Sequence, residues 1–247
     1  MKVLVIGSGG REHALAWKSA QDENVTEVFV CPGNAGTELE DKLTNIEIEH
    51  NDFESIAAFC SEENINLVII GPEQPLVMGL SDFLLSKKIN VFGPSQAAAQ
   101  LEGSKTFSKD FFVKYGIPTA AYESFYNFTD ALSYLNSIDY PTVVKADGLA
   151  AGKGVIICST KSEAIFALES IFKDKAFGSA GSRVVIEEFL EGEEASFIAV
   201  VSKNKMVSLA TSQDHKAVSE GDVGLNTGGM GAYSPAPIVT DAINQKI

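Results

Sequence analysis

The chain has 247 residues, a formal net charge of −14 at neutral pH, and a composition that is 45% hydrophobic and 21% charged. This length suits one or two domains with a substantial core, and the composition is ordinary for a globular protein. The acidic balance argues against a nucleic-acid binder, and three widely spaced cysteines argue against a disulfide framework or a structural zinc site.

The first hundred residues alternate short apolar strands with amphipathic helices. The predicted order is strand at 3–6, helix at 12–20, strand at 27–30, helix at 53–61, strand at 67–70, helix at 76–86 and strand at 90–92. Continuous apolar strands that alternate with helices predict a parallel sheet covered on both faces. We therefore expect a Rossmann-like domain over residues 1–103.

The apolar run from Val3 to Ile6 also bears on location in the cell. It is far too short for a signal-peptide core or a membrane span. Together with the cysteine pattern, which suits a reducing compartment, this predicts a cytoplasmic protein without a membrane partner.

Three loops follow the ends of predicted strands, where open α/β sheets bind their ligands. They are GSGGREH at 7–13, CPGNAGT at 31–37 and GPEQPL at 71–76. The first is close to a dinucleotide-binding turn, but Glu12 stands where the third glycine belongs, and the second strand does not end in an acidic residue. A hydride-transferring oxidoreductase is therefore disfavoured.

A phosphate site is the interpretation that remains for the first loop. Gly9 and Gly10 present backbone N–H groups at the start of a helix, and Arg11 lies in its first turn. All three groups favour a phosphate. The alternative leaves Arg11 as a solvated helix residue. His13 adjoins Glu12 on the helix and cannot face it, so we expect a structural role for His13.

A second helix with an unexpected cation is predicted from Lys105 to Tyr115. Ser104 has the character of its N-cap, and Gly116 follows its end. Lys105 lies in the first turn, where the helix dipole disfavours a positive charge. Either a nearby anion accounts for this lysine, or it is an ordinary surface residue.

The segment from Pro141 to Cys158 predicts a hairpin that binds an anion. Lys145 closes a β-branched apolar run, and a half-buried ammonium is costly unless it has an anionic partner. The following loop carries a second lysine, Lys153, and glycines that let backbone N–H groups approach phosphate oxygens. A bound polyphosphate would satisfy these groups. The alternative is an ordinary hairpin with a flexible tip.

Two later segments are unusual in composition. Five carboxylates crowd into residues 187–194, and such a run is often a solvated loop. The stretch 213–237 is long, rich in glycine and without apolar periodicity, and loops of this kind are usually functional or disordered. It holds Asp214, His215 and Lys216 but no second His or Cys at metal-ligand spacing, so a zinc site is not predicted.

Five motifs together resemble the phosphoribosylamine–glycine ligase family, also called glycinamide ribonucleotide synthetases, of the ATP-grasp superfamily. They are GSGGREHA at 7–14, GPEQPLVMGLSD at 71–82, VVKADGLAAGKGV at 143–155, VVIEEFLEGEEAS at 184–196 and QDHKAVSEGDVGLNTGGMGAYSPAP at 213–237. They follow the order of the family and span nearly the whole chain.

The resemblance implies both a fold and a reaction. The fold class is α/β, with a Rossmann-like pre-ATP-grasp domain at 1–103, an ATP-grasp lid at 123–189 and part of the ATP-grasp core at 104–122 and 190–247. The reaction joins glycine to 5-phosphoribosylamine with ATP, giving glycinamide ribonucleotide, ADP and phosphate through a glycyl phosphate, as a step of purine biosynthesis. Such catalysis relies on positioning and charge neutralisation.

The resemblance also implies roles for particular residues toward ATP. The three lysines expected at the phosphates, with a catalytic role, are Lys105, Lys145 and Lys153. The loop glycines expected to close over the phosphates are Gly148, Gly152 and Gly154. At the hinge, the residues implied at the nucleoside are Glu187, Glu188, Phe189 and Leu190 along the adenine edge, with Glu194 accepting from the ribose hydroxyls.

The other implied contacts are with the acyl acceptor. In the first domain, the residues implied to hold phosphoribosylamine are Gly9, Gly10, Arg11, Glu12, Asn34 and Glu73. The residues implied to complete that side from the later loop are Asp214, Lys216, Asn226, Gly229 and Met230.

The chain departs from the family at its C-terminus. It stops at Ile247, whereas family members continue through the rest of the ATP-grasp core and a further domain. The ligands of the catalytic Mg²⁺ or Mn²⁺ are expected beyond Ile247, so no metal ligand is predicted here. We expect that this 247-residue piece does not complete the reaction alone.

Two other functions stay open beside the glycine ligase. One is another ATP-grasp carboxylate–amine ligase, such as a formate- or bicarbonate-using purine enzyme or a biotin carboxylase. The second is a non-catalytic nucleotide-binding module. The partners expected in each case are small molecules, and the sequence does not determine the oligomeric state.

Overall fold

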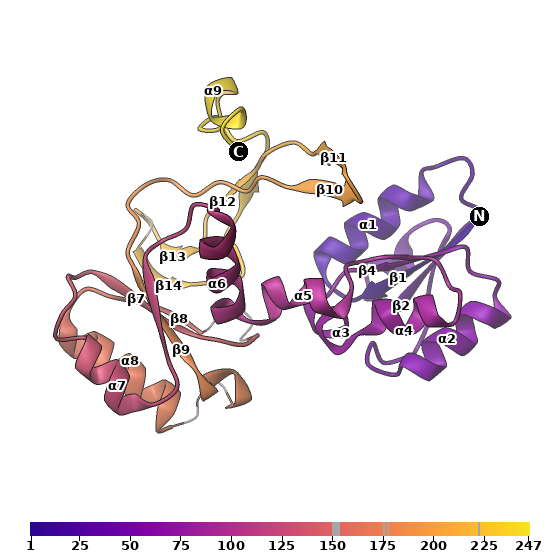
Figure 1. The fold of residues 1–247 in the computed structure, drawn as a ribbon. Coiled ribbons are helices and arrows are strands. Elements are labelled where there is room, and N and C mark those ends of the chain that lie inside the picture. The colour runs from indigo at the N-terminus through magenta and orange to yellow at the C-terminus, as the bar shows by residue number, and fades with distance from the viewer. Residues whose placement is uncertain (150–153, 175, 177, 222) are drawn as a thin grey trace. The chain divides into compact units, whose positions relative to one another are not determined.

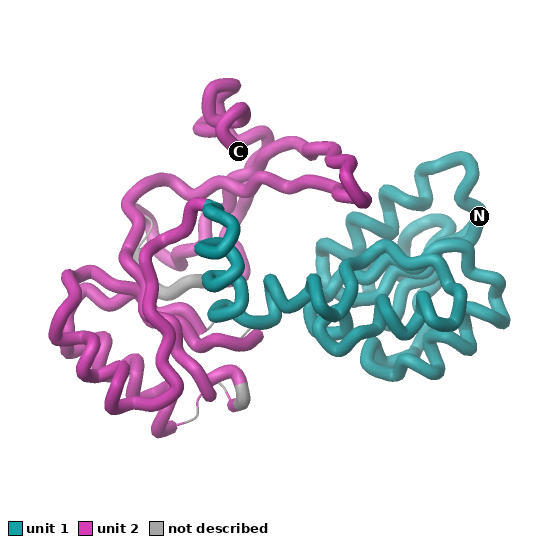
Figure 2. The backbone as a smooth tube through the Cα atoms, viewed as in Figure 1, with its two compact units in different colours: residues 1–117 teal, residues 118–247 magenta. Residues whose placement is uncertain are grey.

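The computed structural model describes residues 1–149, 154–174, 176, 178–221 and 223–247. The chain forms two compact units, unit 1 from Met1 to Ile117 and unit 2 from Pro118 to Ile247 (Figure 2). No helix among these described residues is long and apolar enough to cross a membrane. The predicted division into a domain at 1–103, a lid at 123–189 and a partial core around it stays a prediction.

Unit 1 is built on a five-stranded parallel sheet with the order β3-β2-β1-β4-β5 (Figure 1). Its strands are β1 Lys2–Gly7, β2 Glu27–Pro32, β3 Leu43–Asn45, β4 Leu67–Ile70 and β5 Val91–Phe92. The chain proceeds outward from β1 on one side and resumes beside β1 with β4. The topological switch point of the sheet therefore lies between β1 and β4.

Helices connect these strands and continue after them. They are α1 Gly10–Ala20, the 3-10 helix η1 Thr37–Leu39, α2 Phe53–Glu62, α3 Glu73–Met78, α4 Leu80–Ser86, α5 Gln96–Gly103 and α6 Lys105–Tyr115. The single helix predicted at 76–86 is wrong in one respect. Gly79 adopts a left-handed backbone, with φ of 98°, which ends α3 and starts α4.

Alternate residues of β1 face two different cores. Leu4 and Ile6 join a buried cluster with α2 and α4, whereas Val3 and Val5 pack on the other face with Ala16 of α1. This alternation explains the continuous apolar run, because a strand covered on both faces has no solvent side. The predicted parallel sheet between two helical layers is confirmed.

Unit 2 contains a four-stranded antiparallel sheet with the order β6-β9-β7-β8. The strands are β6 Tyr122–Phe125, β7 Thr142–Ala146, β8 Val155–Cys158 and β9 Val184–Glu188, and the accompanying helices are α7 Phe128–Tyr134, α8 Lys161–Phe172 and η2 Gly178–Ser182. Residues of α7 and α8 cover one face, where Val144 and Ile186 are buried with Leu168 (Figure 1).

The opposite face of this sheet carries the polar groups. Residues directly across antiparallel strands share a face. The register pairs Val143 of β7 with Glu187 of β9 and with Ile157 of β8, so these three form one row across the sheet. Lys145 follows Val143 by two residues and therefore lies on the same face.

The remainder of unit 2 consists of short strand pairs and a terminal helix. The pairs are β10 Ala199–Ser202 with β11 Lys205–Ser208, β12 Gln213–Asp214 with β15 Ala232–Tyr233, and β13 Ala217–Ser219 with β14 Val223–Asn226, and the helix is α9 Asp241–Asn244. The stretch 213–237, which has no apolar periodicity, is thus folded by pairing between residues far apart within it.

Candidate functional site

An arginine lies between two carboxylates at the switch point of unit 1. The Nε of Arg11 donates to Glu12 Oε1 at 2.7 Å, and its Nη1 donates to Glu73 Oε1 at 2.9 Å. Arg11 lies in the first turn of α1, just after the loop that follows β1, and Glu73 begins α3, just after the loop that follows β4, so this chain of charges spans the two strand ends. The expected neighbourhood of Arg11, Glu12 and Glu73 therefore forms, although their contact with a substrate stays a prediction.

This arrangement keeps both exposed partners charged. Burial lowers the pKa of the Arg11 guanidinium, but hydrogen bonds to Glu73 and Glu12 outweigh it and raise the pKa overall. For Glu73, burial raises the pKa, but the hydrogen bond from Arg11, a backbone hydrogen bond and the charge of Arg11 together outweigh that effect and lower the pKa overall. The switch point thus presents a permanent guanidinium at neutral pH.

One of the backbone N–H groups in the glycine loop after β1 already has a hydrogen-bond partner within the protein. The N–H of Gly9 donates to Glu12 Oε2 at 2.8 Å, so this amide is already satisfied. Gly10 begins α1, and a Cβ added there would meet nothing within 4 Å. The approach for an anion is thus open at Gly10 rather than at Gly9. The phosphate roles of both glycines stay predictions.

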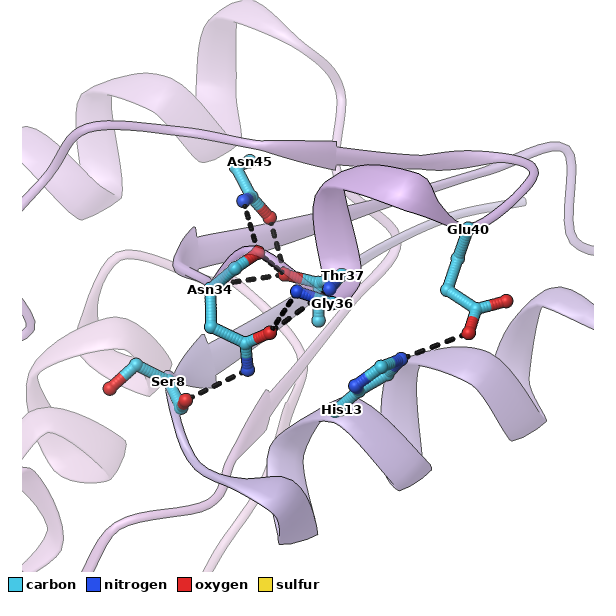
Figure 3. A network of polar contacts seen from close by, with 7 residues as sticks. All are labelled: Ser8, His13, Asn34, Gly36, Thr37, Glu40 and Asn45. Carbon is cyan, nitrogen blue, oxygen red and sulfur yellow. Dashed lines mark hydrogen bonds and ion pairs between the residues drawn. The ribbon is translucent and has the colours of Figure 1, made fainter.

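Asn34 braces the loop after β2 (Figure 3). Its Oδ1 accepts the N–H groups of Gly36 at 2.7 Å and Thr37 at 3.0 Å, and its Nδ2 donates to Ser8 O at 2.9 Å. Asn45 Nδ2 donates to Asn34 O at 2.9 Å and ties the loop to β3. The side chain therefore joins the first two strand-end loops, and the substrate contact expected of Asn34 stays a prediction.

His13 fixes the same loop from the side of α1 (Figure 3). Its Nε2 lies 3.0 Å from Glu40 Oε1, and a Cβ added to Gly36 would lie 2.7 Å from His13 Cε1. The imidazole is thus wedged between α1 and the segment around η1. This packing fits the structural role expected for His13.

Lys105 opens α6 behind a capping serine. Ser104 Oγ accepts the N–H of Phe107 at 3.2 Å, as the sequence predicts for an N-cap. Lys105 belongs to unit 1, whereas Lys145 belongs to unit 2. The expected convergence of these two lysines on one set of phosphates stays a prediction.

Lys145 finds an anionic partner within its own sheet. Its Nζ donates to Glu187 Oε2 at 2.8 Å, across the adjacent strands β7 and β9. The Glu187 side chain is 5% exposed and that of Lys145 is 25% exposed. The requirement for an anion beside this half-buried ammonium is therefore met by Glu187. The carboxylate predicted for the adenine edge also serves the lysine predicted for the phosphates.

The start of the hairpin loop is held by residues that the sequence did not single out. Arg183 Nη2 lies 2.9 Å from Asp147 Oδ2, and the N–H of Asp147 donates to Arg183 O at 3.1 Å. Gly148 approaches η2 so closely that an added Cβ would lie 2.9 Å from Ala180 Cα. The expected phosphate residues Gly152 and Lys153 lie outside the described residues, and the role of Gly154 stays a prediction.

A pocket of about 810 Å³ lies in unit 2 where the acidic segment meets the later loop. It is lined by Ile157, Phe189, Leu190, Glu191, Gly192, Glu193, Glu194, Gln213, Asp214, His215, Lys216, Ala217, Gly224 and Tyr233. Since Ile157 belongs to the row of Val143 and Glu187, the pocket borders the sheet face that carries Lys145. Residues predicted separately for the nucleoside and for the acyl acceptor, such as Leu190 and Asp214, thus line the same pocket.

Lys216 and Glu194 form an ion pair in this pocket. The hydrogen bond that Lys216 donates to Glu194 raises the pKa of Lys216 above its ordinary value, against a smaller opposite effect of burial. Lys216 was expected on the acceptor side and Glu194 at the ribose. Their direct contact places the residue predicted for the ribose beside the residue predicted for the acceptor, and both roles stay predictions.

Three further residues organise the pocket, and none of them is among the predicted site residues. Gln213 is buried, its Nε2 donates to Glu193 Oε2 at 3.2 Å, and its Oε1 accepts from the Tyr233 hydroxyl at 2.5 Å. Pairing of β12 with β15 brings Gln213 and Tyr233 together across the loop. No local signal marked the contact of Gln213 with Tyr233, because it depends on that long-range pairing, whereas Glu193 belongs to the carboxylate run at 187–194.

The remaining predicted residues lie in a turn, at Gly229 and Met230, or at strand ends, at Glu188 and Asn226. Met230 N donates to His215 O at 2.7 Å, and Gly229 N donates to Thr227 Oγ1 at 3.0 Å. Glu188 ends β9, and its N–H donates to Ala121 O at 2.9 Å. Nothing is described of the Asn226 side chain. Substrate contacts for these four residues stay predictions.

A metal site needs several donor side chains that lie close together. Within the part that the structure describes, no group of three or more His, Cys, Asp or Glu residues is arranged to hold a metal ion. These residues therefore do not fit a resident divalent cation by themselves.

Two family models match the chain end to end. The model described as phosphoribosylglycinamide synthetase, N domain, matches residues 1–102, and that described as phosphoribosylglycinamide synthetase, ATP-grasp (A) domain, matches residues 103–247. Both halves of the chain are therefore matched by domains of one family.

Curated relatives agree with this assignment. The phosphoribosylamine–glycine ligase of Vibrio vulnificus strain YJ016 is 57% identical over 247 residues, which are 100% of this chain and 58% of that protein. The ligase of Salmonella typhimurium is 56% identical over 246 residues and is covered to 57%. The chain thus spans less than two thirds of the length of these relatives.

Solved structures agree in fold. The crystal structure of phosphoribosylamine–glycine ligase from Thermotoga maritima has a TM-score of 0.80 at 36% identity, covering 100% of this chain and 59% of that one. The carboxyaminoimidazole ribonucleotide synthase of Aspergillus clavatus, complexed with ATP, has a TM-score of 0.71 at 21% identity, covering 99% and 60%. At that identity the second likeness concerns the fold alone.

Proposed function

The chain belongs to the phosphoribosylglycinamide synthetase family, and from this premise we propose that it is the nucleotide-binding and ribosylamine-binding part of a cytoplasmic phosphoribosylamine–glycine ligase of purine biosynthesis. The observation that carries this proposal is the match of both family domains, in order, over residues 1–102 and 103–247. The proposed substrates are ATP, glycine and 5-phosphoribosylamine.

The pocket of unit 2 supports the nucleotide part of this proposal. Its volume of about 810 Å³ lies in the range of small-molecule sites. Ile157, Phe189 and Leu190 offer apolar surface to an adenine ring. A carboxylate has two oxygens, so Glu194 can accept from a ribose hydroxyl while it also bonds to Lys216.

Lys145 is the residue that we propose for the phosphates in unit 2. An ammonium has three N–H donors, and one of them is given to Glu187. The other two allow a phosphate contact without loss of that pair. Glu187 then has a positioning role as well, because it holds the ammonium on the sheet face that borders the pocket.

The proposed chemistry has two displacement steps. A glycine carboxylate oxygen attacks the γ-phosphorus of ATP, which breaks the bond to the bridging oxygen and releases ADP, and glycyl phosphate results. The amino nitrogen of 5-phosphoribosylamine then attacks the acyl carbon, the C–O bond to phosphate breaks, and the nitrogen loses a proton. Mg²⁺ or Mn²⁺ supplies phosphate neutralisation in reactions of this class.

Unit 1 is proposed to hold the ribosylamine. The guanidinium of Arg11 and the N–H of Gly10 would bind its 5-phosphate at the switch point, and Glu73 would accept from a ribose hydroxyl with the oxygen that Arg11 does not use. The location at strand ends is that of ligands in open α/β sheets.

Calorimetry tests this function on the 247-residue protein. We expect ATP to bind, NAD not to bind, and glycine with 5-phosphoribosylamine to cause no ADP release. Absence of ATP binding would remove the nucleotide role. Full glycine-dependent turnover would contradict the expectation that this piece is inactive alone. Nucleotide binding without turnover also fits the alternative, a non-catalytic module.

A longer protein separates the remaining alternatives. Joining this chain to the C-terminal part of the Vibrio vulnificus relative gives a hybrid of full family length. We expect ADP release with glycine and not with bicarbonate or formate. The preference for glycine follows from 57% identity to glycine ligases, against 21% to a carboxyaminoimidazole ribonucleotide synthase.

A further inference from the structure

Glu12 is a buried carboxylate to which the proposed chemistry gives no task. It lies in the first turn of α1 and is 4% exposed. Each of its oxygens has a partner from the protein: Oε2 accepts the N–H of Gly9 at 2.8 Å, and Oε1 accepts Arg11 Nε at 2.7 Å. A buried carboxylate needs such partners, because an unpaired one is costly.

Three glycines make the space that this side chain fills. A Cβ added to Gly7 would lie 2.3 Å from Glu12 Cγ, and one added to Gly71 would lie 2.3 Å from Glu12 Oε1. A Cβ on Gly9 would lie 2.8 Å from Glu12 Oε2. Gly7 ends β1 and Gly71 follows β4, so the carboxylate is enclosed between the two strand ends and is not presented to a ligand.

Arg11 is the exposed side chain to which the buried Glu12 carboxylate is bonded. Its side chain is 54% exposed, against 5% for that of Glu12. Glu12 binds the Nε edge of the guanidinium and Glu73 binds Nη1, so two of the five N–H donors are used and Nη2 belongs to neither bond. The plane of the guanidinium is thereby set from two sides.

From this geometry we infer that Glu12 is a positioning residue: it fixes the Arg11 guanidinium at the β1/β4 switch point, with the Nη2 edge available for a phosphate, and does not itself touch the substrate. The inference rests on the proposed ribosylamine site in unit 1. It also explains why Glu12 stands where a dinucleotide-binding turn has its third glycine, because the carboxylate takes the Gly9 amide that a pyrophosphate would use.

The charge of Glu12 gives this inference a distinctive consequence. A carboxylate beside a phosphate site repels the ligand unless a cation stands between them. With Arg11 present, Glu12 helps binding by holding the guanidinium. With Arg11 removed, only the repulsion is left. The favourable effect of Glu12 on phosphate affinity should therefore vanish or reverse in sign when Arg11 is replaced.

Arginine side-chain NMR tests the positioning without a ligand. The sequence contains only two arginines, Arg11 and Arg183, and Arg183 is paired with Asp147 in unit 2 as an internal reference. We expect Glu12→Gln to accelerate solvent exchange of the Arg11 Nε–H by about tenfold or more, the effect of losing a hydrogen bond to a charged group, and to leave Arg183 unchanged. An unchanged Arg11 signal in the folded variant would overturn the inference.

A double-mutant cycle tests the role in binding, with ribose 5-phosphate as the calorimetric probe. We expect Glu12→Gln to weaken binding about tenfold in the parent chain. In the Arg11→Ala background the same change should leave the affinity unaltered or increase it. Weakening by a similar factor in both backgrounds would mean that Glu12 contacts the ligand directly, and would overturn the inference.

Controls separate these outcomes from misfolding and from failure of the proposed function. Glu40→Gln changes another carboxylate of unit 1, bonded to His13, and should not affect binding. Trp17 is the only tryptophan and lies on α1, so its fluorescence reports on unit 1. If Glu12→Gln unfolds, Glu12→Asp is used instead: it is shorter by one methylene and keeps the charge, so it should weaken binding in the parent chain and leave the affinity unaltered in the Arg11→Ala background. If ribose 5-phosphate fails to bind the parent chain, the proposed ribosylamine site is wrong. The NMR exchange experiment still tests, without a ligand, whether Glu12 positions the Arg11 guanidinium.

Discussion

At the scale of single residues, Lys145 can form an ion pair within the protein and still bind a phosphate. The apolar run before it predicts a half-buried ammonium with an anionic partner, and the structure supplies Glu187 at 2.8 Å. Burial of the pair is unequal, with the carboxylate almost enclosed and the ammonium partly open. A buried carboxylate that holds a partly open lysine leaves donors for a ligand, so internal pairing does not argue against the phosphate role.

Replacing Lys145 with alanine is the first prediction at this scale. It removes the proposed phosphate contact, so ATP should bind more weakly by about 1.5 to 3 kcal/mol, which is roughly 10- to 150-fold in Kd. Calorimetry well below the thermal midpoint measures this, since the variant also loses the hydrogen bond to Glu187. Lys161→Ala is the matched control, because Lys161 bonds Asn136 on the exposed side of unit 2. Unchanged ATP affinity would remove Lys145 from the site.

At the scale of elements, the loops after β1 and β4 both pack against the Glu12 side chain. Gly7, Gly9 and Gly71 surround it, and Arg11 extends from it to Glu73. The sequence shows the glycines, and it shows that Glu12 stands where a dinucleotide-binding turn has its third glycine. It does not show that the two loops share a carboxylate, because they are more than fifty residues apart.

Two glycines of these loops should respond in opposite ways to alanine. Gly71→Ala places a Cβ 2.3 Å from Glu12 Oε1, and overpacking of this kind should lower the free energy of unfolding of unit 1 by about 1 to 3 kcal/mol. Gly10→Ala meets nothing within 4 Å in the first turn of α1. It should be neutral or stabilise unit 1 by about 0.4 to 1 kcal/mol. Denaturant unfolding followed by Trp17 fluorescence measures both, and equal effects would contradict the packing around Glu12.

At the scale of the whole molecule, the three cysteines report on the cores of both units. Cys31 and Cys60 belong to the core of unit 1 and Cys158 to that of unit 2, and all are free and buried. Burial raises the pKa of Cys31 to about 12 and those of Cys60 and Cys158 to about 11, from an ordinary value of 9.0. The folded chain therefore keeps them as neutral thiols over a range where the unfolded chain ionises them.

This difference predicts slow labelling and a loss of stability in alkali. At pH 8 a thiol reagent should modify the folded protein far more slowly than the protein in denaturant, where all three cysteines react. The contribution of the neutral thiols to stability is full below about pH 9 and falls as the pH rises toward 11 to 12, by up to about 1.4 kcal/mol per thiol and pH unit. Denaturant midpoints at pH 8, 9 and 10 measure it. Rapid labelling of the folded protein would contradict the burial.

The sequence by itself determined the family and the parallel sheet of unit 1, and the site residues that it names stay predictions. These properties follow from patterns among neighbours, such as apolar runs, the glycine turns and the Ser104 cap, and local spacing is sufficient for them. The tertiary structure alone decided which groups satisfy one another. Glu187 pairs with Lys145, Arg11 meets Glu73, and Gln213 meets Tyr233. The physical reason is that a buried charge or amide must find a partner in space. Strand pairing, which brings together residues 42 apart for Lys145 and 20 apart for Gln213, determines which partner that is.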